Sequence, residues 1–141
     1  MADNQEKLTG GALLSTISNR IVGILREYYG RGPTKAKTYA LDDLIVCVLR
    51  NGYTAVEKTI VESGDPDRVV QMRHEFQQLL GPRYKEMIEE LTGRKVIAFL
   101  SQAHLEPDIT IEVFLIDRPL DHAGSAEIAH PKESGGRNEP D

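Results

Sequence analysis

The densest group of side chains that could do chemistry lies between residues 30 and 37. Glycines at 30 and 32 expose backbone N–H groups, and Arg31, Lys35 and Lys37 bring positive charge. On a strand, Lys35 and Lys37 would point to the same side. Such a loop could hold a phosphate, a carboxylate or bicarbonate, or dock on a partner. Because it lacks the P-loop spacing and precedes a strand, the alternative is a solvated turn and an edge strand protected by lysines.

Arg94 and Lys95 form a second basic pair, at the start of a later predicted strand. This pair could face the same groove as the lysines of the first loop, and so belongs to the candidate anion-binding or partner-binding residues. The alternative is that these cations stabilise the C-terminus of the preceding helix.

Metal and catalytic chemistry find little support in the sequence. His104, Glu106 and Asp108 share a turn, but they lack the repeated or helical ligand spacing of zinc sites. Cys47 lies within an apolar run, where a thiol behaves as a small hydrophobic side chain. No Ser-His-Asp or Cys-His arrangement can be argued. We therefore expect no catalytic residue, no metal and no cofactor.

The elements that must position these residues follow from periodicity and from capping residues. Apolar residues recur at helical spacing over 12–29 and from 66 onward, while Thr54 and Glu57 fit a capping box. Gly81 and Pro82 imply either one kinked helix or two helices that meet there. Strands are predicted at 34–41, 44–50, 96–102 and 109–116.

These elements predict an α+β fold, a two-layer sandwich. An approximately four-stranded, mostly antiparallel sheet would carry helices on one face. The order helix, strand, strand occurs over 12–50 and again over 82–116, which indicates a degenerate repeat.

Composition divides the chain into three parts. Residues 1–10 are polar and are expected to be flexible, 11–118 should form a single domain, and 119–141 should be a disordered acidic tail. Acidic and basic residues nearly balance within 11–118, which argues against a nucleic-acid binder. Without a membrane span or secretory signal pattern, a cytoplasmic location is expected.

Several segments together resemble a known bacterial family. They are 30–37, 55–58, 90–101, His104 and the strand that begins at Asp108. In this order they are similar to the MpsC family, named for a proposed Na+-translocating system that generates membrane potential, and the resemblance covers about 11–118. It assigns no chemistry to the matching polar residues, which include Glu57, Lys58, Thr92, His104 and Asp108.

The resemblance implies a non-enzymatic accessory or regulatory protein that docks on a partner. That partner would be the cytoplasmic side of a membrane ion or inorganic-carbon uptake system, with this chain peripheral to the membrane and not inserted in it. The alternative is a sensor or enzyme for a small anion or nucleotide at the loop 30–37. A homodimer is also expected, because helices on one face of a small sheet leave the other face or an edge to be covered.

Overall fold

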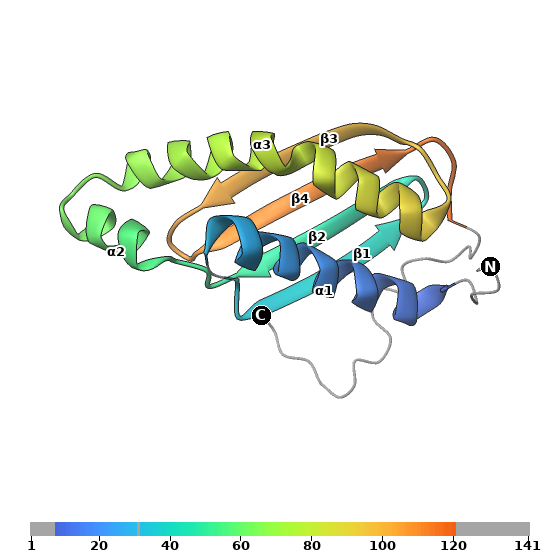
Figure 1. Cartoon of the computed structure of the whole chain (residues 1–141), viewed down its shortest axis with the longest axis horizontal. Coiled ribbons are helices and arrows are strands. Elements are labelled where there is room, and N and C mark those ends of the chain that lie inside the picture. Colours follow the sequence, from blue (N-terminus) through green and yellow to red (C-terminus); the bar gives the residue numbers. More distant parts are fainter. Residues whose placement is uncertain (1–7, 31, 121–141) are drawn as a thin grey trace.

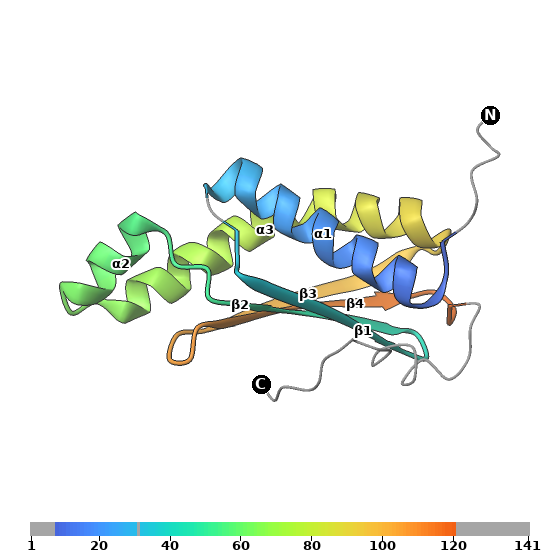
Figure 2. The same ribbon diagram turned by 90° about the horizontal axis from the view of Figure 1, so that it is seen from below.

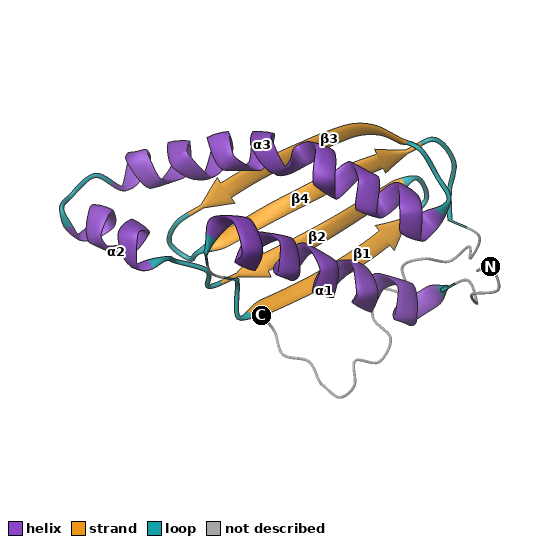
Figure 3. Cartoon of the chain, viewed as in Figure 1, coloured by secondary structure: helices purple, strands orange, loops and turns teal. Residues whose placement is uncertain are grey.

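The computed structural model describes residues 8–30 and 32–120, in which three helices and four strands form an α+β fold (Figures 1 and 3). Arg31 lies outside the described residues, as do residues 1–7 of the predicted flexible N-terminus and residues 121–141 of the predicted tail 119–141. The elements, in chain order, are α1 (Gly10–Tyr29), β1 (Lys35–Leu41), β2 (Leu44–Arg50), α2 (Ala55–Glu62), α3 (Pro66–Thr92), β3 (Val96–His104) and β4 (Ile109–Ile116).

The sheet is antiparallel throughout and has the strand order β1-β2-β4-β3. Each helix, strand, strand unit forms one hairpin, and the hairpins join through their second strands. Helices α1 and α3 pack on the same face, α1 against β1 and α3 against β3, while α2 packs on the first half of α3 (Figure 2). The predicted two-layer arrangement is confirmed.

The boundaries of the first unit follow from local chemistry. Helix α1 ends at Gly30, which adopts a φ of 100° that a side chain would disfavour. The β1–β2 hairpin turns through Asp42 and Asp43, with Asp42 in the left-handed region at a φ of 54°. Aspartate tolerates this conformation better than most residues, so the hairpin forms where predicted.

Helix α3 runs without interruption from Pro66 through Pro82, which decides between the two predicted alternatives. Pro82 lies on the exposed side of the helix, where water can solvate a carbonyl that loses its N–H partner. Gly81 faces the sheet, and a Cβ there would lie 3.4 Å from the Phe99 ring. Glycine thus allows α3 to approach β3 closely.

The core lies between the two helices and the sheet. Ile17 and Ile21 of α1, Tyr84 and Ile88 of α3, and Phe114 of β4 are all fully buried there. Aromatic rings join the layers, because the Tyr84 ring meets the Phe114 ring edge-on at 6.4 Å. This packing fixes α3 over the sheet and thereby positions the polar side chains of its inner face.

Candidate functional site

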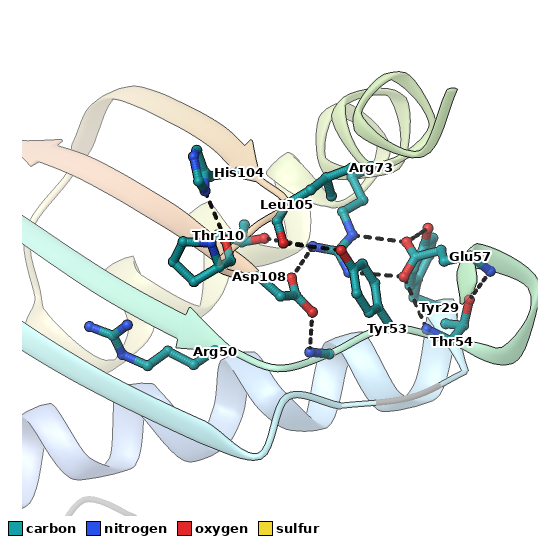
Figure 4. Close-up of polar contacts among 12 residues, drawn as sticks. Tyr29, Arg50, Tyr53, Thr54, Glu57, Arg73, His104, Leu105, Asp108 and Thr110 are labelled. Carbon is teal, nitrogen blue, oxygen red and sulfur yellow. Dashed lines mark hydrogen bonds and ion pairs between the residues drawn. The ribbon is translucent and has the colours of Figure 1, made fainter. Parts of the chain in front are cut away.

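A cluster of buried charges occupies one end of the molecule, where α1 ends, α2 begins and β4 starts (Figure 4). We define the Arg73 cluster as Tyr29, Gly52, Glu57, Arg73 and Asp108. It gathers groups from α1, α2, α3 and two loops, so residues far apart in the sequence meet here. Its centre is the Arg73 guanidinium.

Arg73 forms ion pairs with two carboxylates. Its Nε and Nη2 donate to the two oxygens of Glu57, both at 2.9 Å, and its Nη1 donates to Asp108 Oδ1 at 2.7 Å. The three side chains are 8%, 0% and 9% exposed, respectively, so solvent screens these pairs poorly. Burial by itself would lower the pKa of Arg73, but the bonds to Glu57 and Asp108 raise it above its ordinary value. The guanidinium therefore stays charged.

Glu57 is saturated with donors. Besides the two bonds from Arg73, it accepts a hydrogen bond from the Tyr29 hydroxyl and another from the Thr54 backbone N–H at 3.0 Å. The Thr54 side chain in turn accepts from the Glu57 N–H, which completes the predicted capping box of α2. Burial and the neighbouring Glu57 raise the pKa of Tyr29, so its hydroxyl remains a donor.

Asp108 connects the cluster to the backbone. Its Oδ2 accepts the Gly52 N–H at 2.8 Å, and the adjacent Tyr53 hydroxyl donates to the Leu105 carbonyl at 3.0 Å. The Arg73 guanidinium lies 5.2 Å from the centre of the Tyr53 ring, within the range of a cation–π contact. These contacts hold the β2–α2 segment against the β3–β4 turn.

A small pocket of about 40 Å³ lies beside the cluster. That volume holds a few water molecules or a small ion, since one water needs roughly 10 to 15 Å³. Two carboxylates and one guanidinium give the adjoining cluster a net negative charge. The lining residues are Leu25, Tyr29, Pro33, Leu49, Arg50, Gly52, Arg73, Phe76, Gln77, Asp108 and Thr110.

A second set of polar side chains crosses the sheet beneath the helices. Thr38, Cys47, Glu112 and Ser101 are register partners on β1, β2, β4 and β3, and we call them the Glu112 row. The Thr38 hydroxyl hydrogen-bonds to that of Ser18 on α1 at 2.7 Å. Polar groups thus line one level of an otherwise apolar core.

Glu112 has no cationic partner among the described residues. Gln77 Nε2 donates to its Oε2 at 3.1 Å, whereas its Oε1 lacks a hydrogen bond within the described part of the chain. Burial raises the pKa of Glu112 to about 7, and burial likewise raises the pKa of Cys47 to about 11. Near neutral pH this carboxyl lies between its charged and neutral forms, while the thiol is not a ready nucleophile.

The predicted basic pairs do not come together. Lys35 and Lys37 lie on the edge strand β1, near the end of the sheet that carries the Arg73 cluster. Arg94 and Lys95 precede β3, at the opposite end and on the other edge. The sheet therefore separates the pairs at diagonal corners.

The two members of the second pair also differ in environment. Arg94 is 7% exposed, and its guanidinium donates to the carbonyls of Pro119 and Thr92. Lys95 is exposed. Thr92 accepts the Arg94 N–H and donates to the Ile88 carbonyl, so Thr92 and Arg94 anchor the end of α3.

The remaining motif residues divide between the cluster and the surface. Glu57 and Asp108 form the core of the Arg73 cluster. Lys58 is exposed on α2, and exposed His104 makes a 2.8 Å hydrogen bond to the Pro107 carbonyl within the β3–β4 turn. His104 and Asp108 thus share the predicted turn but make separate contacts.

Sequence reasoning missed Arg73, the residue that unites the cluster. A signal existed, because Val69, Arg73, Gln77, Leu80 and Tyr84 recur at three- and four-residue steps and all face inward. Two polar residues within this stripe mark places where the helix covers charge or hydrogen-bonding groups. The partners could not be found this way, since Glu57 and Asp108 lie on other elements.

The comparisons with known proteins can now be set beside this geometry. The family model described as "Na+-translocating membrane potential-generating system (MpsC)" matches residues 9–118. The chain belongs to the MpsC family. It is also 29% identical over 111 residues to the "Uncharacterized protein YrhF" of Bacillus subtilis (strain 168), an alignment that covers 77% of this chain and 91% of that protein. No solved structure matches.

The matched region contains the whole Arg73 cluster and the whole Glu112 row. Over the described residues, no helix combines the length and apolar character needed to cross a membrane. The same residues contain no group of three or more His, Cys, Asp or Glu side chains placed to hold a metal ion.

Proposed function

We propose that this MpsC-family protein is a non-enzymatic accessory or regulatory protein that docks on a partner. The partner would be a membrane ion or inorganic-carbon uptake system, approached from its cytoplasmic side. The observation that carries the proposal is the match of residues 9–118 to a family named for a membrane-potential-generating system. The family's name describes the system and leaves this chain's own task open.

The chemistry of the Arg73 cluster supports a structural use of its charges. Arg73 donates from Nε, Nη1 and Nη2 to the carboxylates of Glu57 and Asp108. Glu57 accepts from four donor groups. A catalytic acid or base needs a free position for substrate, within hydrogen-bond reach. Glu57 offers none, which favours a protein that acts through its surface.

Co-purification tests the proposal directly. Tagged protein recovered from its native cells at low salt, with in-cell cross-linking, should bring down a membrane transport protein. The double variant Lys35→Ala, Lys37→Ala removes exposed charge from β1 and should reduce recovery if this edge contacts the partner. Arg68→Ala with Lys85→Ala is a matched control, since both residues are exposed on α3. Recovery of no partner by the unaltered protein would contradict docking.

The second candidate function is a sensor for a small anion. It is favoured by the pocket, which brings Pro33 of the glycine-rich loop beside Arg73. The volume of about 40 Å³ suits a small anion such as bicarbonate better than a nucleotide, and the charged lining residues are Arg50, Arg73 and the single carboxylate of Asp108. Thermal-shift assays with millimolar bicarbonate, phosphate and nucleotides test it, since a ligand that binds the folded state raises Tm.

A further inference from the structure

Four buried polar atoms without a hydrogen-bond partner in the described part of the chain gather around Glu112. They are Glu112 Oε1, Gln77 Oε1, Ser101 Oγ and the Tyr84 hydroxyl. Ser101 is the register partner of Glu112, and the Glu112 charge helps to raise the pKa of Tyr84, so both side chains lie near the carboxyl. A buried polar atom without a partner is costly, so this group of atoms requires a physical explanation.

The unpaired oxygens of Glu112 and Gln77 become complementary once the carboxyl carries a proton. Gln77 Nε2 donates to Glu112 Oε2 at 3.1 Å, which leaves one acceptor on each of the two planar groups. A carboxylate can only accept hydrogen bonds, whereas a neutral carboxyl has one O–H donor. With the proton on Oε1, this O–H can donate to Gln77 Oε1 and close a ring of two hydrogen bonds.

The side chains packed around Glu112 supply no positive charge. Burial raises the pKa of Cys47 on β2 to about 11 and also raises the pKa of Tyr84 on α3, so the thiol and the phenol are neutral near pH 7. The other polar side chains of the Glu112 row and its neighbours are the hydroxyls of Ser101 on β3, Thr38 on β1 and Ser18 on α1.

Arg73 lies one turn before Gln77 on α3 but does not serve Glu112. Its Nε, Nη1 and Nη2 all donate to Glu57 and Asp108, so its charge is compensated within the Arg73 cluster. Burial therefore outweighs the smaller, opposite effects of Ser101 and Gln77, and it raises the pKa of Glu112 to about 7.

We propose that Glu112 and Gln77 form a proton-binding pair, a buried site that takes up one proton from water and thereby fastens α3 to the sheet. The neutral pair has two hydrogen bonds between α3 and β4. After the proton returns to water, one bond remains, and two acceptors face each other. Gln77 also lines the pocket beside the Arg73 cluster, which gives the proton a route to solvent. This inference does not rest on the docking proposal.

Infrared spectroscopy tests the pair directly, because a neutral carboxyl has a C=O stretch that a carboxylate lacks. At about pH 6, below the pKa of Glu112, the unaltered protein should show this band and Glu112→Gln should lose it. Glu75→Gln, which changes an exposed carboxylate on α3, should keep it. Absence of the band from the unaltered protein would overturn the proposal.

The partner of the neutral carboxyl can be identified from the position of the same band. Gln77→Met removes the donor to Glu112 Oε2, so the C=O stretch should move to higher frequency. Gln78→Met is the matched control, because Gln78 is the exposed neighbour, and it should leave the band in place. An unshifted band in Gln77→Met would also overturn the proposal, since the pair would not exist.

Cys47, the single cysteine of the chain, reports whether loss of the proton loosens α3. It is the register partner of Glu112 on β2 and is fully buried, so a thiol reagent reaches it only when the layers separate. At about pH 5 the unaltered protein and Glu112→Gln should be labelled at similar rates. At about pH 8 the unaltered protein should react at least ~10-fold faster, the factor that corresponds to one pKa unit. Comparison at one pH cancels the titration of the thiol, and equal rates at both pH values would overturn the proposal.

Discussion

The Arg73 cluster and the Glu112 row both bury carboxylates beneath α3, but only the cluster supplies a cation. Arg73 and Gln77 lie one turn apart on the helix, and Thr110 and Glu112 are successive inward positions of β4. In the Arg73 cluster a guanidinium joins two carboxylates with bonds of 2.7 to 2.9 Å. In the Glu112 row the Glu112 carboxylate accepts one hydrogen bond, from the Gln77 carboxamide, at 3.1 Å.

This difference shows two ways in which a core can hold acidic groups. Ion pairing keeps Glu57 and Asp108 with a permanently charged partner, which locks α2 and the β3–β4 turn to α3. Without a cation, burial raises the pKa of Glu112 to about 7, so its charge depends on pH. The Arg73 cluster should therefore contribute most to the stability of the fold. The Glu112 row should contribute most to the change of that stability with pH.

Removal of the cation should have the largest effect. Arg73→Met leaves two buried carboxylates unpaired, and breaking a buried pair in this way costs about 3 to 5 kcal/mol in the free energy of unfolding. Urea denaturation followed by circular dichroism measures the loss. Arg68→Met is the matched control, because the Arg68 side chain is 64% exposed, and it should change stability by less than ~0.5 kcal/mol.

A neutral version of the cluster sharpens that test. Arg73→Met combined with Glu57→Gln and Asp108→Asn removes the charges together, so it should be distinctly more stable than Arg73→Met alone. If the triple variant is no better than the single one, packing of the Arg73 stem would outweigh its charge.

The Glu112 row should control how stability varies between pH 4.5 and 8. The folded protein holds the Glu112 proton up to about pH 7, while the unfolded chain releases it near the ordinary value of 4.5. Over that interval the folded state binds more protons, so the Glu112 contribution to stability falls as pH rises. Glu112→Gln should remove this slope and stabilise the protein at pH 8 by up to about 3 kcal/mol.

Thermal or urea unfolding at several pH values, run on both proteins, measures the two slopes. Parallel curves for Glu112→Gln and the unaltered protein would show that Glu112 finds a compensating partner. Asp67→Asn is a control for loss of a carboxylate, since Asp67 is exposed in the first turn of α3. It should leave the pH profile nearly unchanged.

A smaller effect should come from the capping box that supports the cluster. Thr54→Ala removes the side-chain acceptor for the Glu57 N–H and should cost about 1 kcal/mol. Thr59→Ala, on the same helix, loses only an exposed bond to the Ala55 carbonyl and should cost less. Equal losses would indicate that Thr54 contributes no more than helix propensity. Melting curves can resolve this difference.

The smallest effect should come from the edge strand. Replacement of Lys35 and Lys37 by Ala should change the stability of the fold by no more than ~0.5 kcal/mol each, because both are exposed and point away from the buried face of the sheet. Unfolding by urea measures this change. A loss of several kcal/mol would reveal that the lysines pair within the fold, through contacts such as that between Lys37 and the Tyr39 ring.

Local sequence signals predicted most of the elements, but not their inner and outer faces. The Asp42–Asp43 turn, the capping box and the strand 109–116 lie where their residue types indicate. In β4 both alternating sets include apolar residues, so periodicity could not tell which set meets the helices. Contact with α3 decides this, and it turns Glu112 inward.

By itself, the sequence determined the order of the elements, the antiparallel α+β arrangement and the family. These depend on turn chemistry, caps and apolar periodicity, which act over a few residues. Only the tertiary structure decided that Glu57, Arg73 and Asp108 share one site, that the two basic pairs lie at opposite corners, and that no cation among residues 8–30 and 32–120 pairs with Glu112. The strand order separates the two basic pairs. The packing of α3 on the sheet brings the cluster together and sets the surroundings of Glu112.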